Sequence, residues 1–222
     1  MIRRVVLVFL AAALGAAVLS WATLPDVRPL AKAWPATTAF MERRKAELAR
    51  RGESTRLEWT PVPLARIAPD LQRAVVAAED ARFFEHDGVD WAATRGALEK
   101  NWEKGNVKVG GSTITQQLAK NLYLSPARTP WRKLRELAIA RRLERELSKK
   151  RILELYLNVI EFGPRTFGVE AAARRYMGEP ARDLTRDQAA TLAAIIPSPR
   201  IYDPVRHPDR VARRAQRILR QM

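Results

Sequence analysis

The 222-residue chain has no cysteine and two histidines, so disulfides and thiolate metal sites are excluded and a histidine-rich metal centre is not expected. Its 40 Lys and Arg against 24 Asp and Glu give a net charge of +16, which indicates an anionic partner such as nucleic acid, a phosphate-bearing substrate or an acidic lipid surface. The length fits one domain with a proper core behind its apolar N-terminal segment.

Residues 5–24 carry no charge. They follow Arg3 and Arg4 and are followed by Pro25. A helix of this length spans about 30 Å and crosses the hydrocarbon layer of a membrane. The positive-inside rule then keeps the N-terminus in the cytoplasm and places residues 25–222 across the membrane. A cleaved signal peptide is the alternative, but the apolar run is long for one and "LSWATLP" is a poor cleavage site. Nucleic acid is therefore not an expected partner.

Prolines and basic residues alternate after the apolar segment, which indicates a juxtamembrane linker with a short helix around residues 38–51. Its Lys and Arg suit anionic lipid headgroups. The prolines of residues 55–69 permit at most one short strand there. We expect three parts: a cytoplasmic tip and transmembrane helix at 1–24, the linker at 25–60 and the folded domain at 61–222.

The first helix of the domain begins at Pro69 and shows one apolar face, formed by Leu71, Ala74, Val75 and Ala78. Glu79 and Asp80 fall in its last turn, where the helix macrodipole disfavours an acid by roughly 0.3–1 kcal/mol. An ion pair with Arg82 would explain them structurally. The alternative is that chemistry requires carboxylates at this place.

Later helices are predicted from their caps. Thr113–Gln116 and Thr185–Gln188 match capping boxes, Thr129 precedes a proline at the first helical position, and Ser148 caps the next helix. The expected helices run from 113 to about 123, from 129 to about 147, from 148 to about 162, over 169–177, from 185 to about 196, and from 208 with Val211, Ala215 and Ile218 on one side. The domain is therefore expected to be mainly α.

The stretch "GGSTITQQLAKN" begins a helix with glycines and hydroxyls, and free backbone N–H groups at such a terminus bind anions. It is not a Walker loop, and a well-capped surface helix is the structural alternative. In "RKLRE", Arg132 and Lys133 precede Glu136 by four and three residues, so the three share a face that continues with apolar residues. Glu136 should thus point toward the core, either as a structural ion pair or as a functional acid. Two inward carboxylates with cations indicate glycosyl chemistry on a phosphorylated sugar.

Four motifs in this order, "EDARFFEHDG", "GGSTITQQLAKN", "RKLRE" and "RILELYLNVIEFG", resemble the signature motifs of the peptidoglycan glycosyltransferases, over about residues 61–203. The resemblance implies a lysozyme-like α-helical fold of two lobes with a cleft, here behind a single N-terminal transmembrane helix, that polymerises lipid II into glycan strands. The expected location is the cell inner membrane, with the catalytic domain periplasmic. The implied partners are lipid II, the nascent glycan strand, membrane lipids and other cell-wall synthesis proteins.

The resemblance also implies roles for particular residues. Glu79 would be the general base and Glu136 the second essential acid of the cleft. The diphosphate would be held by Lys120, Arg132 and Lys133, and the cleft lined by Ser112, Gln116 and Gln117. Asp80, Phe83 and His86 would shape the active-site turn, and Asn158 and Gly163 would be structural. Arg128 lies in a variable stretch and receives no role.

Once cations neutralise the diphosphate it is a good leaving group, so the main need is a base for the acceptor's 4-hydroxyl. The resemblance implies an α-linked donor and a β-linked product, so transfer should invert the anomeric centre, with the carboxyl groups roughly 6.5–9.5 Å apart or more. No cofactor is required, and Mg²⁺ could bridge the diphosphate as an auxiliary, because the sequence shows no dedicated metal-ligand cluster.

Two other functions are compatible with parts of the pattern. A membrane-tethered lysozyme-like muramidase would use two carboxylates but does not require Lys120, Arg132 and Lys133. A non-enzymatic basic binding module would scatter its charges rather than align them with Glu136. A fused transpeptidase is not expected, since no S-x-x-K occurs.

Overall fold

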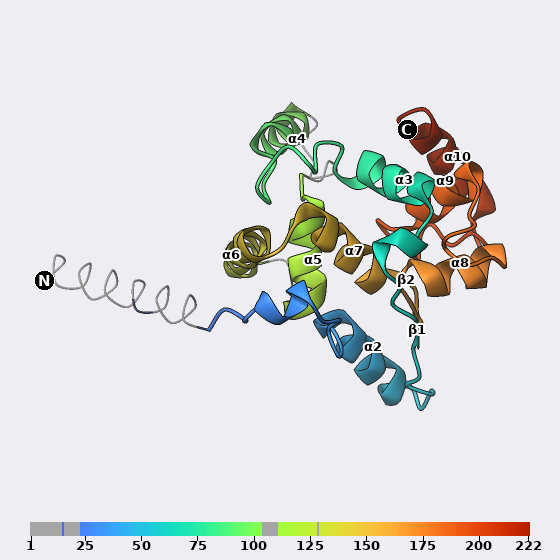
Figure 1. Cartoon of the computed structure of the whole chain (residues 1–222), viewed down its shortest axis with the longest axis horizontal. Coiled ribbons are helices and arrows are strands. Elements are labelled where there is room, and N and C mark those ends of the chain that lie inside the picture. Colours follow the sequence, from blue (N-terminus) through green and yellow to red (C-terminus); the bar gives the residue numbers. More distant parts are fainter. Residues whose placement is uncertain (1–14, 16–22, 104–110, 128) are drawn as a thin grey trace, which may run out of the picture.

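The computed structural model describes residues 15, 23–103, 111–127 and 129–222. Within these residues the chain is mainly helical with a small sheet (Figure 1). The elements are η1 (Arg28–Ala31), α2 (Ala39–Arg50), β1 (Glu58–Trp59), η2 (Leu64–Arg66), α3 (Pro69–Glu79), α4 (Trp91–Glu103), α5 (Ile114–Tyr123), α6 (Pro130–Glu146), α7 (Lys149–Val159), β2 (Glu161–Gly163), β3 (Thr166–Phe167), α8 (Val169–Met177), α9 (Arg186–Ile195) and α10 (Pro208–Leu219).

The sheet has the strand order β1-β3-β2, with β1 parallel and β2 antiparallel to β3. The short strand expected within residues 55–69 is β1, whereas the β2–β3 pair was not predicted from the sequence. Directly after β3, Gly168 has a φ of 77°, and an added Cβ would lie 2.6 Å from the Asn158 carbonyl oxygen. Only glycine fits this close approach, which fixes the start of α8 against the end of α7.

The hydrophobic core surrounds α5, which packs against α2, α6 and α7. Seven of its ten residues are buried, including Ile114, Leu118 and Leu122 on the predicted apolar line. Figure 1 shows α5 and α7 in the middle of the molecule, between α6 and the helices of the C-terminal part. The predicted helix at 38–51 is α2, and its buried Met41 shows that part of the predicted linker joins the core. The boundary at residue 60 stays a prediction.

The second group of packed helices is α3, α9 and α10. Alanines of α9 are buried and let its neighbours approach closely, namely Ala189, Ala190, Ala193 and Ala194. Val211, Ala215 and Ile218 are buried on α10, which confirms the predicted apolar side of this helix. The C-terminal helix is therefore part of the core beside α3 rather than an appendage.

The caps predicted for α6, α7 and α9 are observed. Each capping hydroxyl accepts a hydrogen bond from the backbone N–H three residues on, and the residues are Thr129, Ser148 and Thr185. The capping box predicted at Thr113 is half wrong. Thr113 caps the Gln116 backbone, but the Gln116 side chain donates to the Gly88 carbonyl and accepts from Lys133. The Gln116 side chain therefore connects α5 to Gly88 and to α6 and does not cap the N-terminus of α5.

Across the described ranges, no helix is both long and apolar enough to cross a membrane. The predicted transmembrane helix at 5–24 lies outside the described residues, apart from residues 15, 23 and 24.

Candidate active site

Glu79 is the last residue of α3, and its side chain is only 9% exposed. One carboxylate oxygen accepts a hydrogen bond from Gln117 Nε2 at 3.0 Å, and the other lies 3.3 Å from Nη2 of Arg214. Burial raises the pKa of Glu79, whereas the Gln117 hydrogen bond and the charges of Arg214 and Lys120 oppose that rise. A carboxylate of increased basicity is thereby held in a fixed orientation.

The amide of Gln117 is itself oriented by its neighbours. The hydroxyl of Tyr156, which is fully buried on α7, donates to Gln117 Oε1 at 3.0 Å. Burial raises the pKa of Tyr156 well above its ordinary value, so it remains a donor. Because Oε1 accepts this bond, the NH₂ group of Gln117 must face Glu79. A chain of neutral donors thus runs from the core to the carboxylate.

Glu136 is the second buried carboxylate, 3% exposed on α6. Arg132 and Lys133 both form ion pairs with it, the latter at 2.5 Å between Nζ and Oε1. Lys133 also donates to Ser112 Oγ at 3.1 Å and to Gln116 Oε1 at 2.8 Å. The shared face predicted for these α6 residues is observed, and it connects the first turns of α6 to the start of α5.

Lys120 is half-buried on α5, and the charges of both carboxylates, Glu79 and Glu136, act on its ammonium group. Burial lowers its pKa, whereas the charges of Glu136 and Glu79 raise it. The two cations of the α6 first turns, Arg132 and Lys133, lower it further. Among the described residues, none forms a hydrogen bond or ion pair with its ammonium group in this structure. Lys120 is therefore available to an anionic ligand.

Asp80 and His86 fix the turn that follows α3. Asp80 accepts from Nε2 of His86 at 2.9 Å and from the Ile114 backbone N–H at 3.0 Å, so the turn is tied to the start of α5. Phe83 is completely buried beneath the turn, and the ammonium of Lys149 lies 4.5 Å from its ring centroid. These contacts hold Glu79 at a defined place relative to α5.

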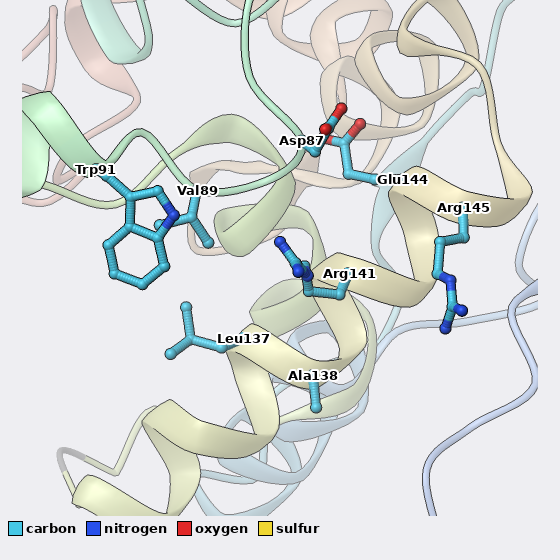
Figure 2. Close-up of a pocket in the computed structure, with 8 residues that line it drawn as sticks. All are labelled: Asp87, Val89, Trp91, Leu137, Ala138, Arg141, Glu144 and Arg145. Atoms are coloured by element: carbon cyan, nitrogen blue, oxygen red, sulfur yellow. The ribbon is translucent and has the colours of Figure 1, made fainter.

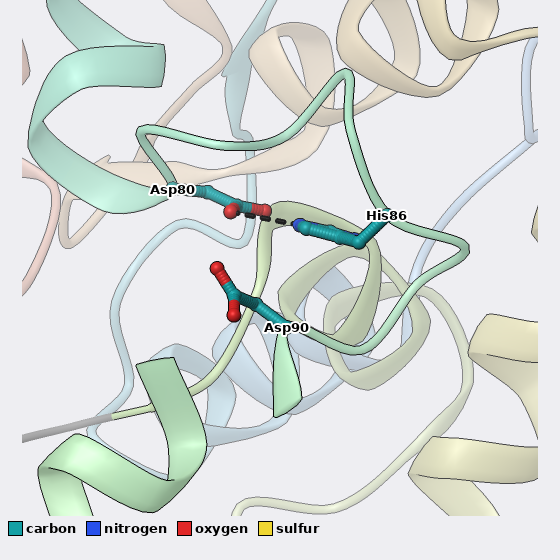
Figure 3. A group of neighbouring side chains, drawn as sticks. All are labelled: Asp80, His86 and Asp90. Atoms are coloured by element: carbon teal, nitrogen blue, oxygen red, sulfur yellow. Dashed lines mark hydrogen bonds and ion pairs between the residues drawn. The ribbon is translucent and has the colours of Figure 1, made fainter. Parts of the chain in front are cut away.

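The same turn brings three possible metal ligands together, which the sequence had not indicated. Ligand atoms of Asp80, His86 and Asp90 all lie within 4.8 Å of one another (Figure 3). Each carboxylate already has protein donors: Asp90 accepts from Arg82 and, at 2.7 Å, from the Ala93 backbone N–H. A metal ion would have to displace the Arg82 ion pair, so the cluster fits a structural network better. Arg82 thus pairs with Asp90 and not with Glu79.

Asn158 lies away from the carboxylates and joins α7 to the segment before α3. Its amide exchanges two hydrogen bonds with the Val62 backbone, at 2.8 and 2.9 Å, and donates to the Glu154 carbonyl at 2.7 Å. At Gly163, an added Cβ would lie 2.8 Å from the Tyr176 hydroxyl oxygen. Arg128 lies outside the described residues.

A groove of about 770 Å³ lies between α6 and the start of α4. Figure 2 shows Trp91 and Val89 facing Leu137 across it, with Arg141 beside them. It contains none of the predicted site residues, because Glu136 and its cations occupy a different face of α6.

Sequence reasoning missed Arg214. The signal was present, since Arg214 follows Val211 by three residues and precedes Ile218 by four, which places an arginine within the buried stripe of α10. A cation inside an apolar stripe requires a buried partner. The identity of that partner depends on how α10 packs against α3.

A mainly helical domain that gathers two buried carboxylates and a set of cations is suited to an enzyme that transfers a glycosyl group from a phosphorylated donor. The comparisons with known proteins specify this class. The transglycosylase family model matches residues 44–222. Biosynthetic peptidoglycan transglycosylases of Laribacter hongkongensis and Nitrosospira multiformis are each 50% identical over 188 residues, which is 85% of this chain and 82% of the relative. The protein of the same name from Chromobacterium violaceum is 48% identical over the same shares.

The chain belongs to the transglycosylase family and is a glycosyltransferase. This confirms the resemblance drawn from the four sequence motifs. The alternative of a non-enzymatic binding module is excluded by the family.

Proposed function

We propose that the protein polymerises lipid II into glycan strands for cell-wall synthesis, with Glu79 as the general base. The observation that carries the proposal is the buried Glu79 carboxylate, held by Gln117 on the same helix that bears Lys120, whose ammonium forms no ion pair with the described residues. Membership of the transglycosylase family supports this activity, and with it lipid II and the glycan strand as substrates. It also supports the lysozyme-like, two-lobed arrangement expected from the motifs.

On the acceptor side, Glu79 takes the proton of the sugar 4-hydroxyl as that oxygen attacks the donor. A base is most effective when its pKa approaches the working pH, and burial moves the pKa of Glu79 in that direction. Gln117 and Arg214 each occupy one lone-pair position, which leaves further positions for the incoming proton.

On the donor side, Lys120, Arg132 and Lys133 neutralise the diphosphate, which leaves as the new bond forms. Glu136 serves this step by holding two of the cations, since it is ion-paired with both Arg132 and Lys133. Ser112 and Gln116 both accept hydrogen bonds from Lys133 and so lie on the donor side of the site. A bound Mg²⁺ would add further neutralisation of the diphosphate. Attack on the side opposite the leaving group inverts the anomeric centre, and the carboxyl separation expected for that course stays a prediction.

We further propose that the chain is anchored in the inner membrane by residues 5–24 and acts on the periplasmic side. Arg142 donates hydrogen bonds to the carbonyls of Leu24 and Pro25, so α6 is bound to the chain where the predicted anchor ends. On the same helix, Trp131 is 46% and Leu134 58% exposed. Apolar side chains beside an anchor suit contact with membrane lipids. Contacts with other cell-wall synthesis proteins belong to this proposal as well.

Incubation of the purified full-length protein with lipid II in detergent tests the function. The proposal expects glycan polymer, and expects none from Glu79→Gln. Cleavage of preformed glycan without polymer formation would instead favour the muramidase, for which Lys120 and its neighbouring cations have no evident task.

A further inference from the structure

Arg214, on the C-terminal helix α10, contacts Glu79 at the end of α3. Its Nη2 lies 3.3 Å from Glu79 Oε1, although the two residues are 135 positions apart. The side chain is 22% exposed, and its guanidinium lies 5.6 Å from the ring centroid of Tyr202. The C-terminal helix thus contributes a cation to the carboxylate that the proposed function makes the base.

The position of Arg214 is costly for folding alone. Its Nε is buried without a hydrogen-bond partner, and within the described part of the chain Glu79 is the acid with which it forms an ion pair. Neighbouring Arg213 and Arg217 on α10 are exposed. A buried ion pair contributes little net stability compared with apolar residues of similar volume. Stability therefore does not explain why an arginine interrupts the stripe of α10.

The groups around Glu79 come from three helices and from the turn that follows α3. Asp80 follows it in the chain, α5 supplies Gln117 and Lys120, α7 supplies Tyr156, and α10 supplies Arg214. Of the two cations, Lys120 forms no ion pair with Glu79 and is assigned to the donor diphosphate. Arg214 is the cation in direct contact with the carboxylate, and it contacts the oxygen that Gln117 leaves free.

We propose that Arg214 is a positioning residue that keeps Glu79 ionised and oriented for proton abstraction. This inference rests on the proposed role of Glu79. In the free enzyme, Arg214 opposes part of the effect of burial and so favours the ionised carboxylate, whose pKa still lies above its ordinary value. The contact also makes completion of the site depend on the docking of α10 against α3 and α9.

The test is the pH dependence of kcat/KM for lipid II polymerisation by the full-length protein, whose acid limb reports the essential base of the free enzyme. Arg214→Met removes the charge but suits the apolar stripe. Loss of the cation disfavours the carboxylate, so its pKa rises and the acid limb should move to higher pH by about one unit, the low end for a carboxylate beside an arginine. Arg214→Lys should restore part of the shift, and the exposed neighbour Arg213→Met should leave the profile unchanged.

A second readout does not depend on activity. The Glu79 carboxyl carbon, assigned in ¹³C NMR by its loss in Glu79→Gln, should titrate at higher pH in Arg214→Met than in the wild type. Thermal unfolding checks that the variants are folded, and Arg214→Gln provides the same comparison if Arg214→Met does not fold.

The outcomes separate the two proposals. An unchanged acid limb and an unchanged Glu79 titration in folded Arg214→Met would overturn the role of Arg214, while an inactive Glu79→Gln would still support the proposed base. Full polymerisation by Glu79→Gln would overturn the proposed base itself, and with it the positioning role of Arg214.

Discussion

The carboxylate of Glu79 lies where two physical effects oppose its charge. The C-terminal end of α3 presents the negative end of the helix macrodipole, and burial favours the protonated form. Gln117 and Arg214 compensate at short range. At the scale of single residues, the site is therefore a balance between unfavourable burial and a small number of placed donors, which makes individual substitutions informative.

Glu79→Gln should keep the shape of the side chain and remove its basicity. We expect polymerisation to fall by at least roughly 100-fold, the lower end for loss of a general base, while lipid II binding persists. Polymer formation from labelled lipid II measures the first and a detergent-phase binding assay the second. The control is Glu85→Gln, an exposed glutamate in the following turn. Trapping of a covalent sugar on either glutamate would contradict the single displacement.

The same variant carries a prediction for stability. Because the folded protein raises the pKa of Glu79 above its ordinary value of 4.5, ionisation of Glu79 opposes folding. The contribution of protonated Glu79 to the free energy of unfolding is therefore fully present below the ordinary pKa. It is lost as the pH rises through the folded-state pKa. Glu79→Gln should therefore melt at a higher temperature than the wild type at neutral pH, and the difference should shrink as the pH falls. Calorimetry at several pH values measures this, and a lower melting temperature at neutral pH would contradict it.

Arg132→Ala and Lys133→Ala should impair use of the donor. Charge-assisted contacts of this kind contribute about 1.5–3 kcal/mol, so each variant should lose roughly 10- to 150-fold in kcat/KM. Both cations also partner the buried Glu136, and the activity must therefore be expressed per folded molecule. Arg141→Ala, an exposed arginine on the same helix, is the matched control. Normal activity per folded molecule in both variants would make the cations structural.

At the scale of elements, Asn158 illustrates how the site is supported from a distance. It connects α7 to the segment that leads into η2 and α3. Asn158→Ala should cost about 1–3 kcal/mol for each buried polar group left without a partner, with activity per folded molecule largely kept. Denaturant unfolding measures the loss, and Gln216→Ala, exposed on α10, should stay within about 0.5 kcal/mol of the wild type. A stable but inactive Asn158→Ala would assign this residue to the chemistry instead.

Local patterns predicted those features that depend on one helix. The inward direction of Glu136 followed from its spacing to Arg132 and Lys133, and three caps followed from residue type and position. Features that depend on how helices pack were not predictable. Neither the Arg214 contact with Glu79 nor the use of the Gln116 side chain by other segments has a signal in local spacing alone. The motifs were therefore sufficient for the family and the enzyme class, while the catalytic roles of the site residues stay predictions and the contacts between helices that support the site were not predicted.

At the scale of the whole molecule, the described residues place the segment that follows the predicted anchor against α6. Leu24 and Val27 are buried, and Arg142 binds the carbonyls of Leu24 and Pro25. The chain that would emerge from the membrane is thus held by the helix that also carries Glu136. This arrangement would keep the donor side of the site near the bilayer in which a lipid-linked substrate is found.

Attachment to the membrane should therefore affect where the enzyme works more than whether it works. A variant lacking residues 1–22 keeps Leu24 and the rest of the described core, so we expect it to polymerise lipid II in detergent micelles but to use lipid II in vesicles poorly compared with the full-length chain. A periplasm-dependent reporter fused after Met222 should be active, because Arg3 and Arg4 favour a cytoplasmic N-terminus. Fractionation of cells should find the full-length chain, with residues 1–24 still attached, in the membrane pellet. A mature protein that lacks these residues, or a fused reporter that functions only in the cytoplasm, would contradict the proposed anchor. Equal use of vesicle-borne lipid II by both forms would show instead that the surface of α6 around Trp131 and Leu134 is sufficient for access to the bilayer.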